Sequence, residues 1–189
     1  MTDLSLYSVQ AILILDGSGN RVYANYYKPP HQSEEQLSVL SQSVKKQKEF
    51  EEQLFAKTHK HDSEISIFED HLVLYKEYLD VTLYLVGSIE ENEMVLQLAF
   101  TAFKDSLDLI LNSGIDKKNI QEHYDMVMLA IDETIDHGVI LETDPAAIAS
   151  RVTKPPINEP QISLDLDKGL FGAWGFAKSR LQEKLQQGI

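Results

Sequence analysis

The chain has 189 residues, enough for one domain with an appendage, and its 43% apolar content is sufficient for a core. The net charge of −13 argues against nucleic-acid binding, because phosphate backbones would be repelled. The absence of cysteine excludes a disulfide scaffold and a cysteine-based zinc site, and it suits a reducing cytosol. No apolar run is long enough to span a bilayer and no signal-peptide pattern is present, so we expect a cytosolic protein.

The first predicted element is a β-hairpin over residues 8–27. Apolar runs at 9–15 and 21–27 flank the turn sequence Asp16-Gly17-Ser18-Gly19-Asn20. The same glycines could form a phosphate cradle, but such a loop opens into a helix, and this one opens into a strand. We therefore favour a hairpin turn over a phosphate site.

A charged helix is predicted next, and then a group of three strands. Ser33 and Gln36 fit a capping box at the start of the helix. The strand-like runs at 64–68, 71–78 and 81–86 are rich in β-branched and aromatic residues. Because the connections between them are so short, an antiparallel meander is expected.

A second long helix is predicted over residues 92 to about 112, and it is apolar on nearly every side. Such a helix needs cover from more than one direction, which a sheet and a partner protein would provide. The side chains predicted to contact the partner are Leu96, Phe100, Phe103 and Leu107.

Two further helices are predicted before the proline-containing C-terminal part of the chain. One begins at Asp116 and ends before Gly138, which fits the position after a helix C-terminus. The other is short and begins at the pair Asp144-Pro145, which fits a cap followed by the first helical residue.

The C-terminal part is predicted to be a linker followed by an amphipathic helix. Residues 153–168 contain two proline-rich strings and are interpreted as exposed, and residues 169–189 return to helical spacing with a basic excess. Helices of this kind lie on an anionic membrane or dock into a groove; packing against its own domain is the alternative. The predicted contact residues are Leu170, Trp174, Lys178, Leu181, Lys184 and Leu185.

The sequence offers no recognisable active site. His59-Lys60-His61 could be half of a metal site, but it lies in a polar stretch without further ligand spacing, so a solvated loop is favoured. Glu133 and His137 are interpreted as an exposed ion pair one helical turn apart. No cysteine nucleophile and no Gly-x-Ser-x-Gly elbow occurs. We expect a protein that is not an enzyme and has no metal and no cofactor.

Three strings in a fixed order carry a resemblance to a known family. They are residues 11–17 with Asn20-Arg21, then Tyr75-Lys76-Glu77-Tyr78, and residues 132–144. With the order of elements, they resemble the small subunits of vesicle-coat complexes, most closely the coatomer zeta family, over about residues 8–150. The resemblance implies an α+β fold of longin type over residues 1–152, a five-stranded antiparallel sheet flanked by helices, to which the linker and amphipathic helix are added.

The same resemblance implies a non-catalytic structural subunit of the COPI vesicle coat. Such a subunit would form an obligate pair with the gamma coatomer subunit. It would be cytoplasmic and would lie on the cytosolic face of Golgi membranes and coated vesicles as a peripheral protein. An Arf-family GTPase would be an indirect partner. The coat would act in Golgi-to-ER retrograde and intra-Golgi transport. Two alternatives stay open: a longin-type membrane-tethering or GTPase-regulatory module, and a sigma-like clathrin-adaptor small subunit. In the latter case Arg21 could mimic a basic residue that binds cargo.

Overall fold

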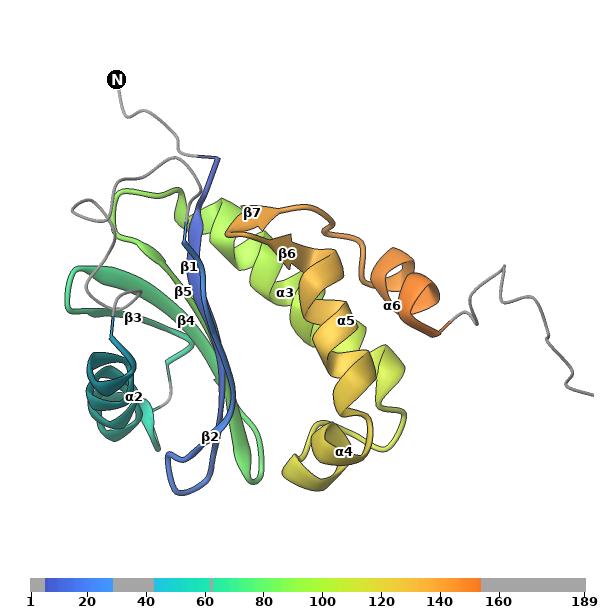
Figure 1. Ribbon diagram of the computed structural model, residues 1–189, viewed down its shortest axis with the longest axis horizontal. Coiled ribbons are helices and arrows are strands. Elements are labelled where there is room, and N and C mark those ends of the chain that lie inside the picture. The colour runs from blue at the N-terminus through green and yellow to red at the C-terminus, as the bar shows by residue number, and fades with distance from the viewer. Residues whose placement is uncertain (1–5, 29–42, 62, 154–189) are drawn as a thin grey trace, which may run out of the picture. The chain divides into compact units, whose positions relative to one another are not determined.

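The computed structural model describes residues 6–28, 43–61 and 63–153. Its elements are β1 (Val9–Asp16), β2 (Arg21–Tyr26), α2 (Val44–Thr58), β3 (Ile65–Phe68), β4 (His71–Glu77), β5 (Val81–Ser88), α3 (Glu93–Ile110), α4 (Lys117–Glu122), α5 (Tyr124–Thr134), β6 (Ile135–Asp136), β7 (Val139–Ile140) and α6 (Pro145–Thr153). Five strands form an antiparallel sheet in the order β2-β1-β5-β4-β3, with helices on both faces (Figure 1). The α+β, longin-like fold expected from the sequence is confirmed.

The predicted hairpin of β1 and β2 is confirmed, and its turn is closed by one carboxylate. Asp16 Oδ1 accepts hydrogen bonds from the backbone N–H groups of Ser18 and Asn20, each at 2.9 Å. Gly19 has a φ of 79°, a left-handed conformation that glycine adopts without strain. Because two turn N–H groups already bond to Asp16, the turn does not form a phosphate cradle.

The predicted meander of β3, β4 and β5 is also confirmed. β4 pairs with β3 on one side and with β5 on the other, both antiparallel. The β3–β4 turn places Glu69 and Asp70 at φ values of 45° and 62°. The β4–β5 turn is closed by a hydrogen bond from Tyr78 N to Val81 O at 2.8 Å.

The sheet has a core on each face, because side chains alternate along its strands. In β1, Ile12 and Ile14 pack with α3, α5 and α6, whereas Leu13 and Leu15 pack with α2. Figure 1 shows the sheet between α2 on one side and the layer of α3, α5 and α6 on the other. In the part of the chain that the structure describes, no helix is both long and apolar enough to cross a membrane.

The prediction of one helix from Asp116 towards Gly138 is corrected. The chain breaks at His123 into α4 and α5, and Asp116 caps α4 by accepting a hydrogen bond from Asn119 N at 2.8 Å. Gly138 lies in the β6–β7 turn with a φ of 87° rather than directly after a helix. A Cβ atom there would lie 2.5 Å from Val9 O, so glycine is required because the turn approaches β1 so closely.

The remaining predicted boundaries are tested only in part. Asp144 caps α6 as expected, since its Oδ1 accepts a hydrogen bond from Ala146 N at 2.9 Å. Thr153 is still part of α6, so the predicted linker begins at least one residue later. The rest of the linker, the predicted helix 169–189 with its six contact residues, and the Ser33 cap lie outside the described residues.

Candidate interaction surface

The outward side of α3 carries four exposed apolar residues together with the exposed acids Asp105 and Asp108, although the helix is packed against the sheet, α5 and α6. We call it the α3 outer face and define it as Met94, Val95, Leu98 and Leu109. Met94 is 74% exposed and Leu98 is 55% exposed. Asn92 fixes the start of the helix by accepting a hydrogen bond from Met94 N at 2.9 Å. Single exposed apolar residues are ordinary, but four on one helix are typical of an interaction site.

The four residues of α3 predicted to contact a partner lie on the opposite side. Leu96, Phe100, Phe103 and Leu107 are all buried in the core between α3 and the sheet. The prediction of these four as partner contacts is therefore wrong. Their spacing marks the stripe that faces the sheet, and the sequence did not distinguish it from the second apolar stripe that faces outward.

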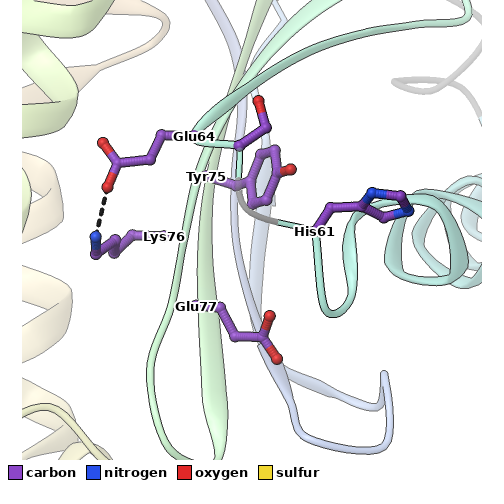
Figure 2. A pocket seen from close by; sticks show the side chains of 6 residues that line it. His61, Glu64, Tyr75, Lys76 and Glu77 are labelled. Atoms are coloured by element: carbon purple, nitrogen blue, oxygen red, sulfur yellow. Dashed lines mark hydrogen bonds and ion pairs between the residues drawn. The ribbon is translucent and has the colours of Figure 1, made fainter.

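A polar cleft of about 440 Å³ lies beside the last three residues of β4, Tyr75 to Glu77 (Figure 2). These residues come directly after the part of β4 that pairs with β3. Its lining includes part of the Tyr75-Lys76-Glu77-Tyr78 string that carries the family resemblance. The lining residues are His61, Ser63, Glu64, Tyr75, Lys76 and Glu77. In Figure 2, Lys76 forms an ion pair with Glu64, and both extend away from His61.

The charged groups around the cleft hold the structure together. Glu77 Oε1 lies 2.9 Å from His59 Nδ1, and Glu77 Oε2 accepts a hydrogen bond from Lys60 N at 3.1 Å. The His59 ring also stacks on Phe55, with ring centroids 4.8 Å apart. The described residues contain no group of three His, Cys, Asp or Glu side chains that could hold a metal ion. The His59-Lys60-His61 stretch is thus the connection after α2, tied to β4 by Glu77.

Arg21, considered as a mimic of a cargo-binding residue, is bonded inside the protein. Its Nε lies 3.0 Å from Glu51 Oε2 and its Nη2 lies 2.5 Å from Glu51 Oε1. Tyr26 donates a further hydrogen bond to the nearly buried Glu51 carboxylate at 2.8 Å. The hydrogen bond to Glu51 raises the pKa of Arg21. Arg21 therefore fixes α2 to β2 instead of presenting a free guanidinium group.

A second polar cluster joins the β1–β2 and β4–β5 turns to the start of α4. Lys117 Nζ lies 2.9 Å from Asp16 Oδ2, and Lys117 N donates to Asp80 Oδ1 at 3.0 Å. Burial alone would raise the pKa of Asp16, but hydrogen bonds from Lys117, Asn20 and Ser18 lower it to about 2. The cluster is structural, because its donors and acceptors bond to one another.

The proposed ion pair between Glu133 and His137 is not formed. α5 ends at Thr134, so the two residues do not lie one helical turn apart. Glu133 instead lies 3.1 Å from Arg151 of α6, and His137 lies 3.7 Å from Asp136. The Glu133–Arg151 pair connects α5 to α6.

Comparisons with known proteins identify the family. The model of the clathrin adaptor complex small chain family matches residues 8–156. Coatomer subunit zeta of Saccharomyces cerevisiae is 72% identical over 189 residues, which is all of both chains. The chain belongs to the coatomer zeta family. Coatomer zeta subunits are components of the COPI coat. The family resemblance that the three sequence strings indicated is confirmed.

Other relatives support the same family and fold. Coatomer subunit zeta-1 of Homo sapiens is 40% identical over 163 residues, which cover 84% of this chain and 86% of the human one. The Bos taurus protein of the same name matches equally well. A chain of the "Homology model of the full-length AP-3 complex in a stretched open conformation" matches with a TM-score of 0.57 and 17% identity, covering 76% of this chain and 90% of that one. At this identity the match shows the fold alone.

Proposed function

We propose that this chain is the small, non-catalytic subunit of a COPI coat and forms an obligate pair with a gamma coatomer subunit. The 72% identity to yeast coatomer subunit zeta over the full length carries the proposal. Its work is to brace the larger partner within the coat. The coat is recruited to Golgi membranes by an Arf-family GTPase and serves Golgi-to-ER and intra-Golgi transport, so the subunit is cytoplasmic and peripheral on those membranes.

The α3 outer face supports this pairing. An obligate interface is large and hydrophobic, and its core is depleted of charge. Met94, Val95 and Leu98 provide an uncharged apolar surface within two turns of α3. We place the contact with the gamma subunit on this face.

The first test is affinity purification of the full-length chain from cytosol, followed by mass identification of the proteins retained in high salt. We expect a gamma coatomer subunit together with the other subunits of a stoichiometric coat. Recovery of sigma-type adaptor partners would keep the fold and change the pathway. A chain recovered without a large partner would overturn the proposal.

A matched pair of variants tests the surface. Leu98→Asp should abolish retention of the gamma subunit, because it buries an unpaired charge in the interface. Leu129→Asp on α5 is the control, since Leu129 is 51% exposed and thus resembles Leu98 in size and exposure. If both variants retained the gamma subunit equally well and kept their thermal stability, the gamma subunit would not bind at the α3 outer face.

The alternative of a longin-type tethering or regulatory module predicts a different behaviour of the domain alone. A regulatory module should be soluble as residues 1–152, whereas an obligate subunit without its partner should aggregate. Sedimentation of that fragment, expressed alone and with a gamma subunit, separates the two. Solubility only on co-expression supports the coat subunit.

A further inference from the structure

The β3 edge of the sheet is closed by side chains. Tyr75 N donates to Glu64 O, so the alternate residues Ile65 and Ile67 turn their backbone groups away from β4. Ser63 Oγ donates to Ile65 O at 2.7 Å and accepts from Ile65 N at 3.3 Å. Lys57 Nζ donates to Ile67 O at 2.6 Å. This edge is thus protected against an added strand, as exposed sheet edges commonly are.

The opposite edge, β2, has no such protection from the described residues. Tyr27 N donates to Gln10 O at 2.9 Å, which places Ala24 and Tyr26 in the alternate, outward-facing positions. No hydrogen bond from residues 6–28, 43–61 or 63–153 reaches their outward N–H and C=O groups. β2 is also longer than β3, with six residues against four. Its outward groups are therefore suited to pair with an additional strand.

An uncompensated negative charge lies beside this edge, on the α5 side. Burial, with the Asp132 carboxylate nearby, raises the pKa of Tyr23 to about 12, and Asp132 and Asp136 both act on Tyr27. Tyr27 is further joined to this region by a hydrogen bond to Ile135 O at 3.4 Å. Burial and the neighbouring Asp136 raise the pKa of Asp132, and no described lysine or arginine pairs with it. Asp132 and Asp136 are exposed whereas Tyr23 and Tyr27 are buried, so a cation brought to this edge would meet the two carboxylates and relieve their mutual repulsion.

We propose that the β2 edge binds an extended segment of a partner protein as an added strand, with lysine or arginine at alternate positions facing Asp132 and Asp136. The backbone of Ala24 and Tyr26 would supply the hydrogen bonds, and the acidic side of α5 would select the cations. A second copy of this chain is a poorer occupant, because it also carries a net charge of −13 and would bring like charges together. The proposal does not depend on pairing with the gamma subunit.

The probe is a short acetylated peptide of alternating lysine and valine, labelled for fluorescence anisotropy and titrated onto the full-length chain, either alone or co-purified with a gamma subunit. One matched control has glutamate in place of lysine. The other keeps lysine but has N-methyl groups on alternate backbone nitrogens, so its charge is unchanged and it cannot pair with a strand edge. We expect only the unmethylated lysine peptide to bind, and to slow hydrogen exchange at the Ala24 and Tyr26 amides.

Proline substitution provides the test on the protein side. Ala24→Pro removes an outward N–H without breaking a bond to β1, so it should weaken peptide binding about tenfold or more. Ile67→Pro makes the same change on the β3 edge and should have no effect. Asp132→Asn should weaken binding about threefold, in keeping with one partly screened ion pair.

Three results would each overturn the proposal. They are equal binding of the N-methylated peptide, unchanged binding by Ala24→Pro, and slow exchange of the Ala24 and Tyr26 amides already in the free chain. If Ala24→Pro does not fold, the comparison of methylated and unmethylated peptides on the unaltered protein decides the question.

Discussion

Asp16 joins three segments of this protein that are far apart in the sequence. Its carboxylate bonds to the β1–β2 turn and to Lys117 of α4, whose backbone N–H in turn bonds to Asp80 of the β4–β5 turn. The hydrogen bonds to the Asp16 carboxylate from Lys117 Nζ and from the turn favour its charged form, which is why its pKa falls despite burial. The charge of one residue thereby contributes to the packing of α4 against both turns.

This arrangement predicts a dependence of stability on acid. Because the pKa of Asp16 is lowered from 3.8 to about 2, its contribution is present above pH 4 and is lost as the pH falls towards 2. After allowance for solvent, Asp16→Asn should lower the free energy of unfolding at neutral pH by about 1–2 kcal/mol. The variant should then lose less stability on acidification than the unaltered chain. Denaturant unfolding at neutral and acid pH measures both effects.

Asp125→Asn is the control for this prediction, because Asp125 is an exposed acid in the first turn of α5. It should resemble the unaltered chain at both pH values. If Asp16→Asn and the unaltered chain lost the same amount of unfolding free energy on acidification, the Asp16 charge would not stabilise the fold.

At the scale of elements, α3 has two apolar stripes with different roles. Leu96 packs against β5 so closely that a Cβ at Gly87 would lie 2.5 Å from Leu96 Cδ1. Leu98, two residues later, points outward and is 55% exposed. Both are leucines in one helix, so only the face on which each lies separates a core residue from a surface residue.

The two leucines therefore make a matched pair for a stability measurement. Leu96→Ala leaves a cavity beside Gly87 and should destabilise the chain by about 2–5 kcal/mol. Leu98→Ala should change the free energy of unfolding by less than about 0.5 kcal/mol, because more than half of its surface is already exposed to water. Chemical denaturation of the full-length chain measures both. A large loss for Leu98→Ala would show that the outer face is covered within the chain itself.

The elements that could be predicted from the sequence are those defined by local signals. Asn92 and Asp144 cap helices as expected, and Asp16 to Asn20 forms the turn. The break at His123 was missed, because the apolar spacing continues through it and favours a single helix. The four α3 residues predicted to contact a partner face the sheet instead, for a related reason: hydrophobic periodicity finds apolar stripes, and tertiary packing decides which of them the sheet covers.

At the scale of the whole molecule, the predicted tail differs from the domain in charge. The chain as a whole carries −13, whereas residues 169–189 contain more basic than acidic side chains. An acidic domain is repelled by an anionic membrane, while a basic amphipathic helix is attracted to one. We therefore propose that membrane contact, where it occurs, is made by the tail and not by the described domain.

Substitution of the tail's apolar stripe tests this proposal. Trp174→Ala combined with Leu181→Ala should lower co-sedimentation with phosphatidylserine-containing vesicles and leave thermal stability unchanged, because the apolar anchors are lost while the basic residues stay. Ser179→Ala combined with Gln186→Ala changes the other side of the same predicted helix and should retain binding. Raised salt should weaken the binding that remains, since screening reduces the attraction of Lys178 and Lys184 to the lipid. Unchanged vesicle binding with a lower melting temperature would instead mean that the stripe packs on the protein's own domain.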